Sequence, residues 1–255
     1  MSEDNKLQKK IICITGGKGF IGRQLINKLN KSNCQIRALT RNKNNNFPRN
    51  INIFIGDLTD PNFSLTKFLK NCDILYNCAG EINDEKKMDA LHINGTQKLI
   101  NAVKQEAKIS KKKLHWIQLS SCGAYGPPNY SEIETERLIT ETSKTRPTNK
   151  YERTKTKADE MVMKSSYNNF YYTILRPSNV IGITMTNQSI RKLIKLINSK
   201  YFFFIGKKDS ISTFIHVDDV VRALILISIN LKSRDEIFNL SSDCTWEALI
   251  KQISS

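Results

Sequence analysis

The chain has 255 residues, of which 39% are hydrophobic, and carries a formal net charge of +16. This length and apolar content suit one large α/β domain, or a domain with a small appendage, that buries a substantial core. No apolar run reaches the roughly 18–20 residues of a membrane-spanning helix, and the first residues lack a signal peptide's apolar segment, so we expect no membrane association and a cytoplasmic location.

The positive charge is spread along the chain instead of forming one basic stripe. Lysine and asparagine recur in runs such as residues 42–46 and 111–113, a pattern typical of solvated faces. We therefore expect no nucleic-acid partner, although nucleic-acid binding remains a minor alternative. The charge also suits small anionic ligands such as dinucleotides and nucleotide sugars.

Neither the cysteines nor the histidines are spaced like metal ligands. The six cysteines fall singly, without a C-x-x-C pair, and the three histidines are scattered among different predicted elements. We expect no disulfide and no metal site.

The first predicted strand ends in a glycine-rich loop. Residues 15–22 read T-G-G-K-G-F-I-G and lead into a helical pattern. In such a unit Gly16 permits a tight turn, Gly19 lets the backbone approach a pyrophosphate, and Gly22 lets helix and strand pack closely. A glycine loop alone is weak evidence, but a second strand at 35–39 follows at the offset of a βαβ unit. The loop therefore predicts a dinucleotide site.

Strands and helices alternate along the rest of the chain. We predict strands at 51–55, 73–78, 114–119, 171–175, 201–204 and 237–240. Helical patterns cover 65–69, 84–107, 151–168, 188–198, 219–229 and the residues from 245 onward. Such alternation predicts an α/β fold with a doubly wound parallel sheet and helices on both faces.

A tyrosine and a lysine lie four residues apart after the fifth predicted strand. Tyr151 and Lys155 share one helix face, and a nearby ammonium should lower the pKa of the phenol from about 10 toward the range of a general acid/base. Ser120 and Ser121 follow the fifth strand at its carboxyl end, where open α/β sheets bind their ligands. Ser121, Tyr151 and Lys155 could surround one reacting C–O group, although serines at strand ends are also common turn formers.

Taken together, these motifs make the chain resemble an extended short-chain dehydrogenase/reductase of the NAD-dependent epimerase/dehydratase family, the nucleotide-sugar enzymes. The resemblance runs from Lys10 to about Gln252. Besides the glycine loop it rests on G-D-L-T-D at 56–60, N-C-A-G at 77–80, N-G-T at 94–96, S-S-C-G-A-Y-G at 120–126, Y-x-x-x-K at 151–155, L-R-P-S-N-V-I-G at 175–182 and F-I-H-V-D-D-V-V at 214–221.

The resemblance implies a role for each matching position. It implies a Rossmann-type sheet in which the catalytic residues are Ser121, Tyr151 and Lys155. The expected cofactor contacts are Gly16, Lys18, Gly19, Phe20, Ile21, Gly22, Arg41, Asp57, Leu58, Cys78, Ala79, Gly80, Asn94, Tyr151 and Lys155. Among them Asp57 is expected at the adenine and Asn94 near the nicotinamide. The expected substrate contacts are Ser121 and Asn179, the latter at a nucleotide diphosphate.

The F-I-H-V-D-D-V-V motif is expected to be structural. We predict that Asp218 caps a helix beginning at Asp219 and that His216 is a buried, hydrogen-bonded histidine.

The end of the second strand departs from the family's NAD pattern. The acidic residue that usually binds the ribose hydroxyls is replaced by Thr40, followed by Arg41. A guanidinium suits a 2′-phosphate, and Lys18 adds a second positive charge in the glycine loop. We predict NADP as the preferred cofactor over NAD, with Arg41 merely facing solvent as the alternative.

The catalytic loop departs from the dehydratase pattern. Cys122 and Gly123 occupy the positions of the Asp-Glu pair that eliminates water in dehydratases, so we expect no dehydration. Epimerisation through a keto sugar and one-way reduction of a keto sugar remain, and the expected NADP preference favours reduction. Two other functions stay open: a cofactor-binding sensor or assembly factor without efficient turnover, and a reductase of a non-sugar ketone.

We expect two parts of unequal size. Residues 1–177 should form the dinucleotide-binding domain and 178–255 a partial substrate lobe, with 214–241 returning to the first domain. The chain stops where family members continue, so the lobe is either reduced or truncated. The resemblance also implies a homodimer.

Overall fold

The computed structural model describes residues 3–42, 47–129, 137–185, 189–199, 202–203 and 207–254. The strands of its main sheet are β1 (Ile11–Thr15), β2 (Gln35–Thr40), β3 (Asn52–Ile55), β4 (Ile74–Asn77), β5 (His115–Leu119), β6 (Tyr171–Pro177) and β9 (Glu236–Leu240). Within the described residues these strands are all parallel and follow the order β3-β2-β1-β4-β5-β6-β9. The predicted doubly wound parallel sheet is confirmed, and its order reverses between β1 and β4.

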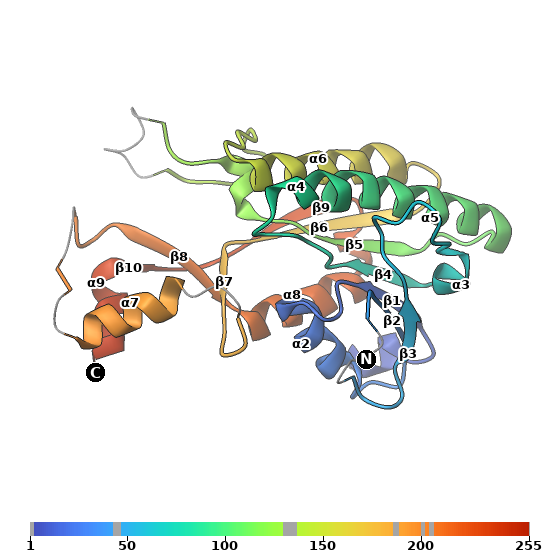
Figure 1. Cartoon of the computed structure of the whole chain (residues 1–255), viewed down its shortest axis with the longest axis horizontal. Coiled ribbons are helices and arrows are strands. Elements are labelled where there is room, and N and C mark those ends of the chain that lie inside the picture. Colours follow the sequence, from blue (N-terminus) through green and yellow to red (C-terminus); the bar gives the residue numbers. More distant parts are fainter. Residues whose placement is uncertain are drawn as a thin grey trace.

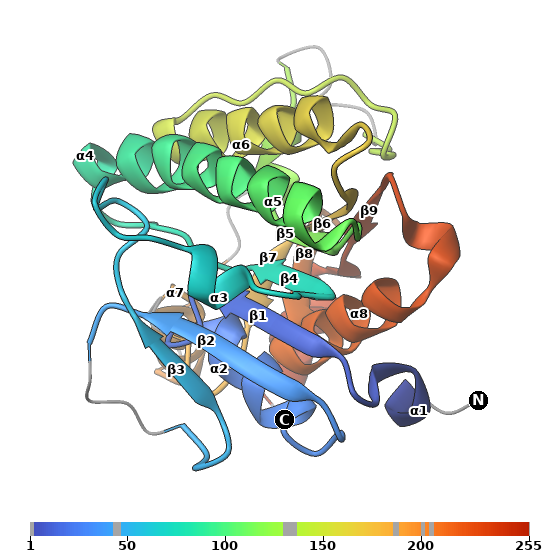
Figure 2. The same cartoon turned by 90° about the vertical axis from the view of Figure 1, so that its right-hand side faces the viewer.

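Helices cover both faces of this sheet (Figures 1 and 2). One face carries α1 (Glu3–Leu7), α2 (Phe20–Leu29) and α8 (Val217–Ile229), and the other carries α3 (Thr66–Leu69), α5 (Thr96–Ser110) and α6 (Lys150–Ser166). Side chains of β1 alternate between the two cores, with Ile12 and Ile14 on one side and Cys13 on the other, all fully buried. A strand covered on both faces must be apolar throughout, which is why β1 shows no polar alternation.

The segment predicted as one helix over 84–107 contains three helical parts. α4 (Glu85–Met88) leads into a π-helical turn, η1 (Asp89–Gly95), and then into α5. The wider turn changes the register of the side chains between the two α-helical parts. Such π turns are frequent at functional sites.

A smaller sheet lies at one end of the molecule (Figure 1). It pairs β10 (Ser242–Thr245), β8 (Ile211–His216) and β7 (Asn179–Ile181), next to α7 (Ser189–Asn198) and α9 (Trp246–Ser254). These three strands were not predicted as such, because they are short and partly exposed. Of the predicted strand at 201–204, residues 202–203 have no regular structure and the others lie outside the described residues.

The start of α8 differs from the prediction. The helix begins at Val217, and His216 occupies the N-cap, where its Nδ1 accepts a hydrogen bond from the Asp218 backbone at 3.3 Å. The His216 side chain is 46% exposed. The predicted buried histidine and the predicted Asp218 cap are therefore both wrong. Asp218 and Asp219 instead place negative charge in the first turn, where it interacts favourably with the positive end of the helix dipole.

Among the described residues, no helix combines the length and apolarity needed to cross a membrane.

Below neutral pH, we expect His115 to make the fold less stable. The ring is buried between Thr173 Oγ1, at 2.7 Å, and the Ser228 carbonyl, at 3.2 Å, and burial lowers its pKa from 6.5 to about 4. The unfolded chain therefore binds the proton more tightly, so the free energy of unfolding should fall by about 2–3 kcal/mol from this group as the pH drops from 6.5 toward 4. Urea unfolding across this range measures the slope. His115→Gln should make it shallower, and an unchanged slope would contradict the assignment.

Candidate active site

The glycine loop is held against the end of β4 so closely that a side chain cannot fit. Gly16 has a φ of +66°, and a Cβ there would lie 2.5 Å from the Cys78 carbonyl oxygen and 2.6 Å from the Ala79 nitrogen. A Cβ at Gly22 would lie 2.3 Å from the Gly16 carbonyl oxygen. Gly16 therefore makes the turn, Gly22 lets α2 start directly on it, and the backbone left open between them fits the pyrophosphate of a dinucleotide.

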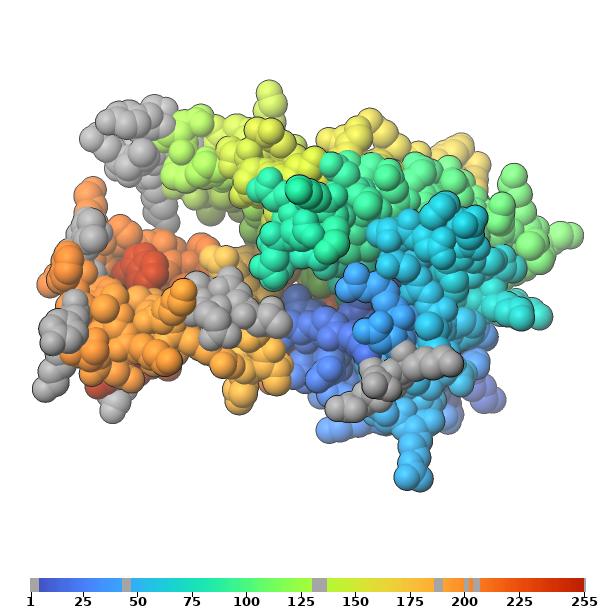
Figure 3. All heavy atoms as spheres, in the orientation of Figure 1, coloured from blue at the N-terminus to red at the C-terminus, as the bar shows by residue number. Residues whose placement is uncertain are grey.

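A cavity of about 390 Å³ opens beside this loop, at the point where the strand order reverses. Figure 3 shows a hollow between the blue N-terminal elements and the blue-green α4. Nine expected cofactor residues line the cavity: Gly16, Lys18, Gly19, Arg41, Asp57, Leu58, Cys78, Ala79 and Gly80. The lining also includes residues that the sequence did not single out, among them Thr15, Glu81 and Lys87.

Polar side chains buried in the sheet support the floor of the cavity. Thr15 Oγ1 donates to Asn77 Oδ1 at 2.6 Å and accepts from the Ala79 nitrogen at 3.3 Å. Asn77 Nδ2 in turn donates to Gln118 Oε1 at 3.0 Å. This chain of hydrogen bonds fixes β1, β4 and β5 relative to one another.

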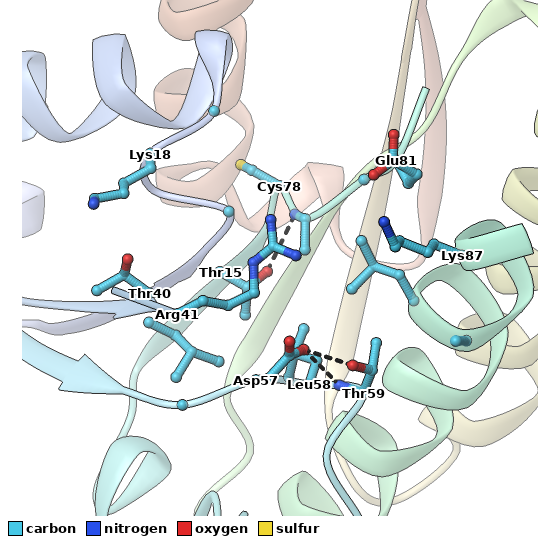
Figure 4. A pocket seen from close by; sticks show the side chains of 18 of the residues that line it. Thr15, Lys18, Thr40, Arg41, Asp57, Leu58, Thr59, Cys78, Glu81 and Lys87 are labelled. Carbon is cyan, nitrogen blue, oxygen red and sulfur yellow. Dashed lines mark hydrogen bonds between the residues drawn. The ribbon is translucent and has the colours of Figure 1, made fainter. Parts of the chain in front are cut away.

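Positive charge surrounds the outer part of the cavity. Figure 4 shows Arg41 and Lys87 reaching into it from opposite walls, the first from the end of β2 and the second from α4, whereas the Lys18 side chain points outward from the loop. Lys87 is paired with Asp84 at 2.8 Å. Asp57 is held by the Thr59 nitrogen and hydroxyl, at 2.8 and 2.9 Å, which fixes its carboxylate at the cavity wall.

The catalytic trio predicted from the sequence lies at the carboxyl end of β5. Ser121 caps the short 3-10 helix η2 (Cys122–Tyr125) and accepts from the Gly123 nitrogen at 3.1 Å. Tyr151 and Lys155 lie on α6, and Lys155 is buried with its ammonium donating to the Leu119 carbonyl. The Ser121 side chain also lies close enough to the Tyr151 phenol to lower its pKa.

The electrostatics of Tyr151 differ from the prediction. Burial, followed by the nearby Asp159 carboxylate, raises the pKa of Tyr151 to about 12, and the Ser121 side chain lowers it only in part. The prediction of a lowered pKa is therefore wrong for this structure. The phenol is protonated at neutral pH, which suits a proton donor. Burial also lowers the pKa of Lys155, against the attraction of Asp159.

Asp159 continues the helix face of Tyr151 and Lys155 and is completely buried. Its Oδ2 accepts from Ser120 Oγ at 2.7 Å and from Arg176 Nη2 at 3.2 Å. Arg176 Nη1 donates to the Tyr125 hydroxyl at 3.0 Å. The network joins α6 to the ends of β5 and β6. A signal was present in the sequence, because Asp159 follows Lys155 at the same four-residue spacing.

The remaining predicted residues lie outside the cavity lining, and they include Ser121, Tyr151 and Lys155. Phe20, Ile21 and Gly22 form the first turn of α2. Asn179 is exposed on β7, where its Nδ2 donates to the Thr213 carbonyl at 3.2 Å. Asn94 is exposed as well.

His92, two residues before Asn94, is the buried polar residue of this turn. It is 3% exposed, and its ring lies edge-on to the Tyr151 ring at a centroid distance of 5.8 Å. The sequence gives no sign of this contact, because the π turn replaces the regular helical spacing there.

Comparisons with known proteins agree with this geometry. The model of the NAD dependent epimerase/dehydratase family matches residues 12–241. A putative UDP-glucose 4-epimerase of Methanocaldococcus jannaschii is 26% identical over 246 residues, covering 91% of this chain and 77% of that protein. A bifunctional dihydroflavonol 4-reductase/flavanone 4-reductase of Malus domestica is 24% identical over 277 residues, covering 96% and 76%. The solved structure of MoeE5 in complex with UDP-glucose and NAD superposes with a TM-score of 0.75 at 22% identity, covering 95% of this chain and 80% of that one.

Substitutions of glycine test the close approach of the loop to the end of β4. Gly16→Ala should destabilise the protein and weaken dinucleotide binding strongly, because its Cβ collides with backbone atoms and a positive φ strains any L side chain. Gly80→Ala is the matched control for stability, since a Cβ there meets only His92 Nε2 at 3.7 Å. Thermal unfolding and calorimetric titration with NADP⁺ measure both effects. Equal stability of the two variants would contradict the close approach.

Proposed function

Because the chain belongs to the NAD-dependent epimerase/dehydratase family, we propose that it is an NADP-preferring oxidoreductase that acts on a nucleotide-activated keto sugar. One observation carries this proposal: Ser121 and Tyr151 lie together at the carboxyl edge of the sheet, where buried Lys155 binds the Leu119 carbonyl. The glycine loop follows β1 at the same edge. A bound dinucleotide would supply the hydride, held by the glycine loop and the cavity wall.

Each member of the trio has a role that follows from its surroundings. Tyr151, protonated at neutral pH, donates its proton to the carbonyl oxygen of the substrate as that oxygen becomes an alcohol. The Ser121 hydroxyl orients the same oxygen. The Lys155 ammonium lies beneath the site and favours the phenolate that remains after the proton has left.

The proposed NADP preference favours reduction over epimerisation, and a phenol that is protonated at neutral pH is compatible with reduction. An epimerase must first remove a proton from a sugar hydroxyl, which needs the phenolate, whereas a ketoreductase starts from the phenol. Dehydration is not proposed, because Cys122 and Gly123 carry no acid/base group for eliminating water. The Cys122 thiol instead donates to the Arg176 carbonyl at 3.0 Å, and burial raises its pKa.

The cofactor preference rests on the cations around the cavity. Thr40 at the end of β2 is nearly buried and offers no carboxylate to ribose hydroxyls. Arg41 instead reaches into the cavity with positive charge that suits a 2′-phosphate, and Lys18 adds positive charge on the neighbouring loop.

The nucleotide-sugar substrate is supported by the named relatives, UDP-glucose 4-epimerase and the UDP-glucose complex of MoeE5. The Malus domestica relative, a reductase named for dihydroflavonol and flavanone, favours a second candidate, a reductase of a non-sugar ketone. A third candidate, a cofactor-binding sensor or assembly factor, would bind the dinucleotide without turnover. Incubation with NADPH and a panel of keto sugars and flavanones, followed by nicotinamide absorbance, separates the three.

We also propose separate roles for the main sheet and the smaller sheet. Residues 1–177 would bind the dinucleotide, together with α8 and β9 from within 214–241. The smaller sheet and its helices would contact the substrate, with Asn179 at the nucleotide diphosphate. We further propose a cytoplasmic homodimer.

Replacing the guanidinium should change the cofactor preference. Arg41→Ala should weaken NADP⁺ binding by about tenfold or more, the loss expected for a charge-assisted hydrogen bond, and leave NAD⁺ binding nearly unchanged. Calorimetric titration with both cofactors measures this, and Arg49→Ala, an exposed arginine outside the cavity lining, serves as the control. Equal affinity of the wild-type protein for both cofactors would contradict the preference.

Removing the phenolic hydroxyl should abolish turnover. Tyr151→Phe should lower kcat by about 100-fold or more, as expected for a lost general acid, while the dissociation constant of NADPH changes little. Stopped-flow or steady-state nicotinamide absorbance gives the rate. Retained activity in this variant would end the assignment of Tyr151.

A further inference from the structure

His92 connects the wall of the cofactor cavity to the helix that carries the catalytic tyrosine. The Glu81 backbone N–H donates to His92 Nε2 at 2.8 Å. On the other side of the ring, Nδ1 lies 2.8 Å from Thr154 Oγ1. Glu81 belongs to the loop that lines the cavity, and Thr154 lies in the helical turn between Tyr151 and Lys155. One side chain therefore spans the two walls of the site.

The hydrogen bonds define one tautomer. Because Nε2 accepts from a backbone N–H, the ring proton is on Nδ1 and is donated to Thr154. The Thr154 hydroxyl donates onward to the Lys150 carbonyl at 2.9 Å. Burial and the Lys155 ammonium lower the pKa of His92 to about 4, so the ring stays neutral near physiological pH. Both ring nitrogens therefore form hydrogen bonds. These bonds belong to a chain of hydrogen bonds that runs from the Glu81 loop to α6.

The loop attached to His92 is itself well ordered by short-range contacts. The Glu81 carboxylate accepts from the backbone nitrogens of Ile82, Asn83 and Asp84 at 3.0, 2.9 and 3.2 Å. These bonds hold the loop together, and the bond from the Glu81 N–H to His92 connects it, through Thr154, to α6. Gly80 lies beside the ring, since a Cβ there would lie 3.7 Å from Nε2.

The ring also restricts the phenol. It lies edge-on to Tyr151, at an interplanar angle of 79°, on the same α6 turn that Thr154 occupies. Displacing the ring would free Tyr151 on that side. The His92 ring therefore contacts both the loop that lines the cofactor cavity and the tyrosine proposed to transfer the proton.

We propose that His92 is a positioning residue that couples the cofactor-lining loop at Gly80–Glu81 to the catalytic helix at Tyr151–Lys155. This inference rests on the proposed function. His92 touches neither substrate nor cofactor in this role. It acts through the Glu81 backbone and the Thr154 hydroxyl.

Substitutions at position 92 separate the two hydrogen bonds. Phenylalanine keeps the ring volume and removes both bonds, whereas glutamine places a carbonyl oxygen near the position of Nε2 and can still accept from Glu81. In the full chain, His92→Phe should weaken NADP⁺ binding by about tenfold or more, because the Glu81 N–H loses its acceptor. His92→Gln should stay within about threefold of the wild-type affinity. Calorimetric titration gives the dissociation constants.

Two controls distinguish positioning from general destabilisation. His115→Phe removes the other buried neutral histidine, which lies away from the cavity lining, and should lower Tm without changing NADP⁺ affinity. Thr154→Val removes the acceptor of the Nδ1 proton, and its effect on NADP⁺ affinity should disappear in the His92→Phe background, as expected for one shared connection.

Three results would overturn the inference while leaving the proposed function intact: wild-type affinity in His92→Phe, equal weakening by His115→Phe, or additive effects of Thr154→Val and His92→Phe. Failure of the wild-type protein to bind either dinucleotide would instead overturn the proposed function, and the inference with it.

Discussion

The structure depends on one close approach, that of the glycine loop after β1 to the end of β4. Gly16 and Gly22 leave no room for side chains, and the backbone there reaches within 2.5 Å of where a Cβ would stand. This contact places the start of α2 at the point where the strand order reverses, and so creates the cavity at the carboxyl edge of the sheet. The buried chain of hydrogen bonds from Thr15 through Asn77 to Gln118 connects β1, β4 and β5.

A second, separate set of contacts holds α6, the helix of Tyr151 and Lys155. Tyr151, Lys155 and Asp159 occupy successive turns of α6, and Asp159 is bound to Ser120 and Arg176 in the interior. Removing one partner of such a buried ion pair typically costs about 3–5 kcal/mol, because the other charge is left uncompensated. Asp159 thus fixes the helix to the sheet and raises the pKa of Tyr151 at the same time. The packing of α6 and the pKa of Tyr151 therefore both depend on this carboxylate.

The sequence predicted the parts of the fold that depend on strong local patterns. The apolar strands and the glycine loop were clear because buried parallel strands are continuously apolar and the turn requires glycine. The small sheet was missed because β7, β8 and β10 are short, partly exposed and paired with distant segments. The cap of α8 by His216 was missed because a histidine at the N-cap is uncommon beside two aspartates.

The residues that line the cavity could be predicted from sequence motifs, whereas the residues that contact the trio from other elements could not. The nine motif residues in the cavity lining come from sequence signatures that specify backbone shape. His92 and the pKa of Tyr151 depend on tertiary contacts. The first lies in a π turn that changes the helical register, and the second is raised by burial and by Asp159. Neither effect leaves a periodic trace in the sequence.

A crystal structure of the protein with NADP⁺ tests the central claim most directly. The account predicts the pyrophosphate over Gly16 and Gly19, the 2′-phosphate beside Arg41, and the nicotinamide next to the Tyr151 hydroxyl. A nucleotide bound elsewhere, or a nicotinamide separated from Tyr151 by protein side chains, would contradict it.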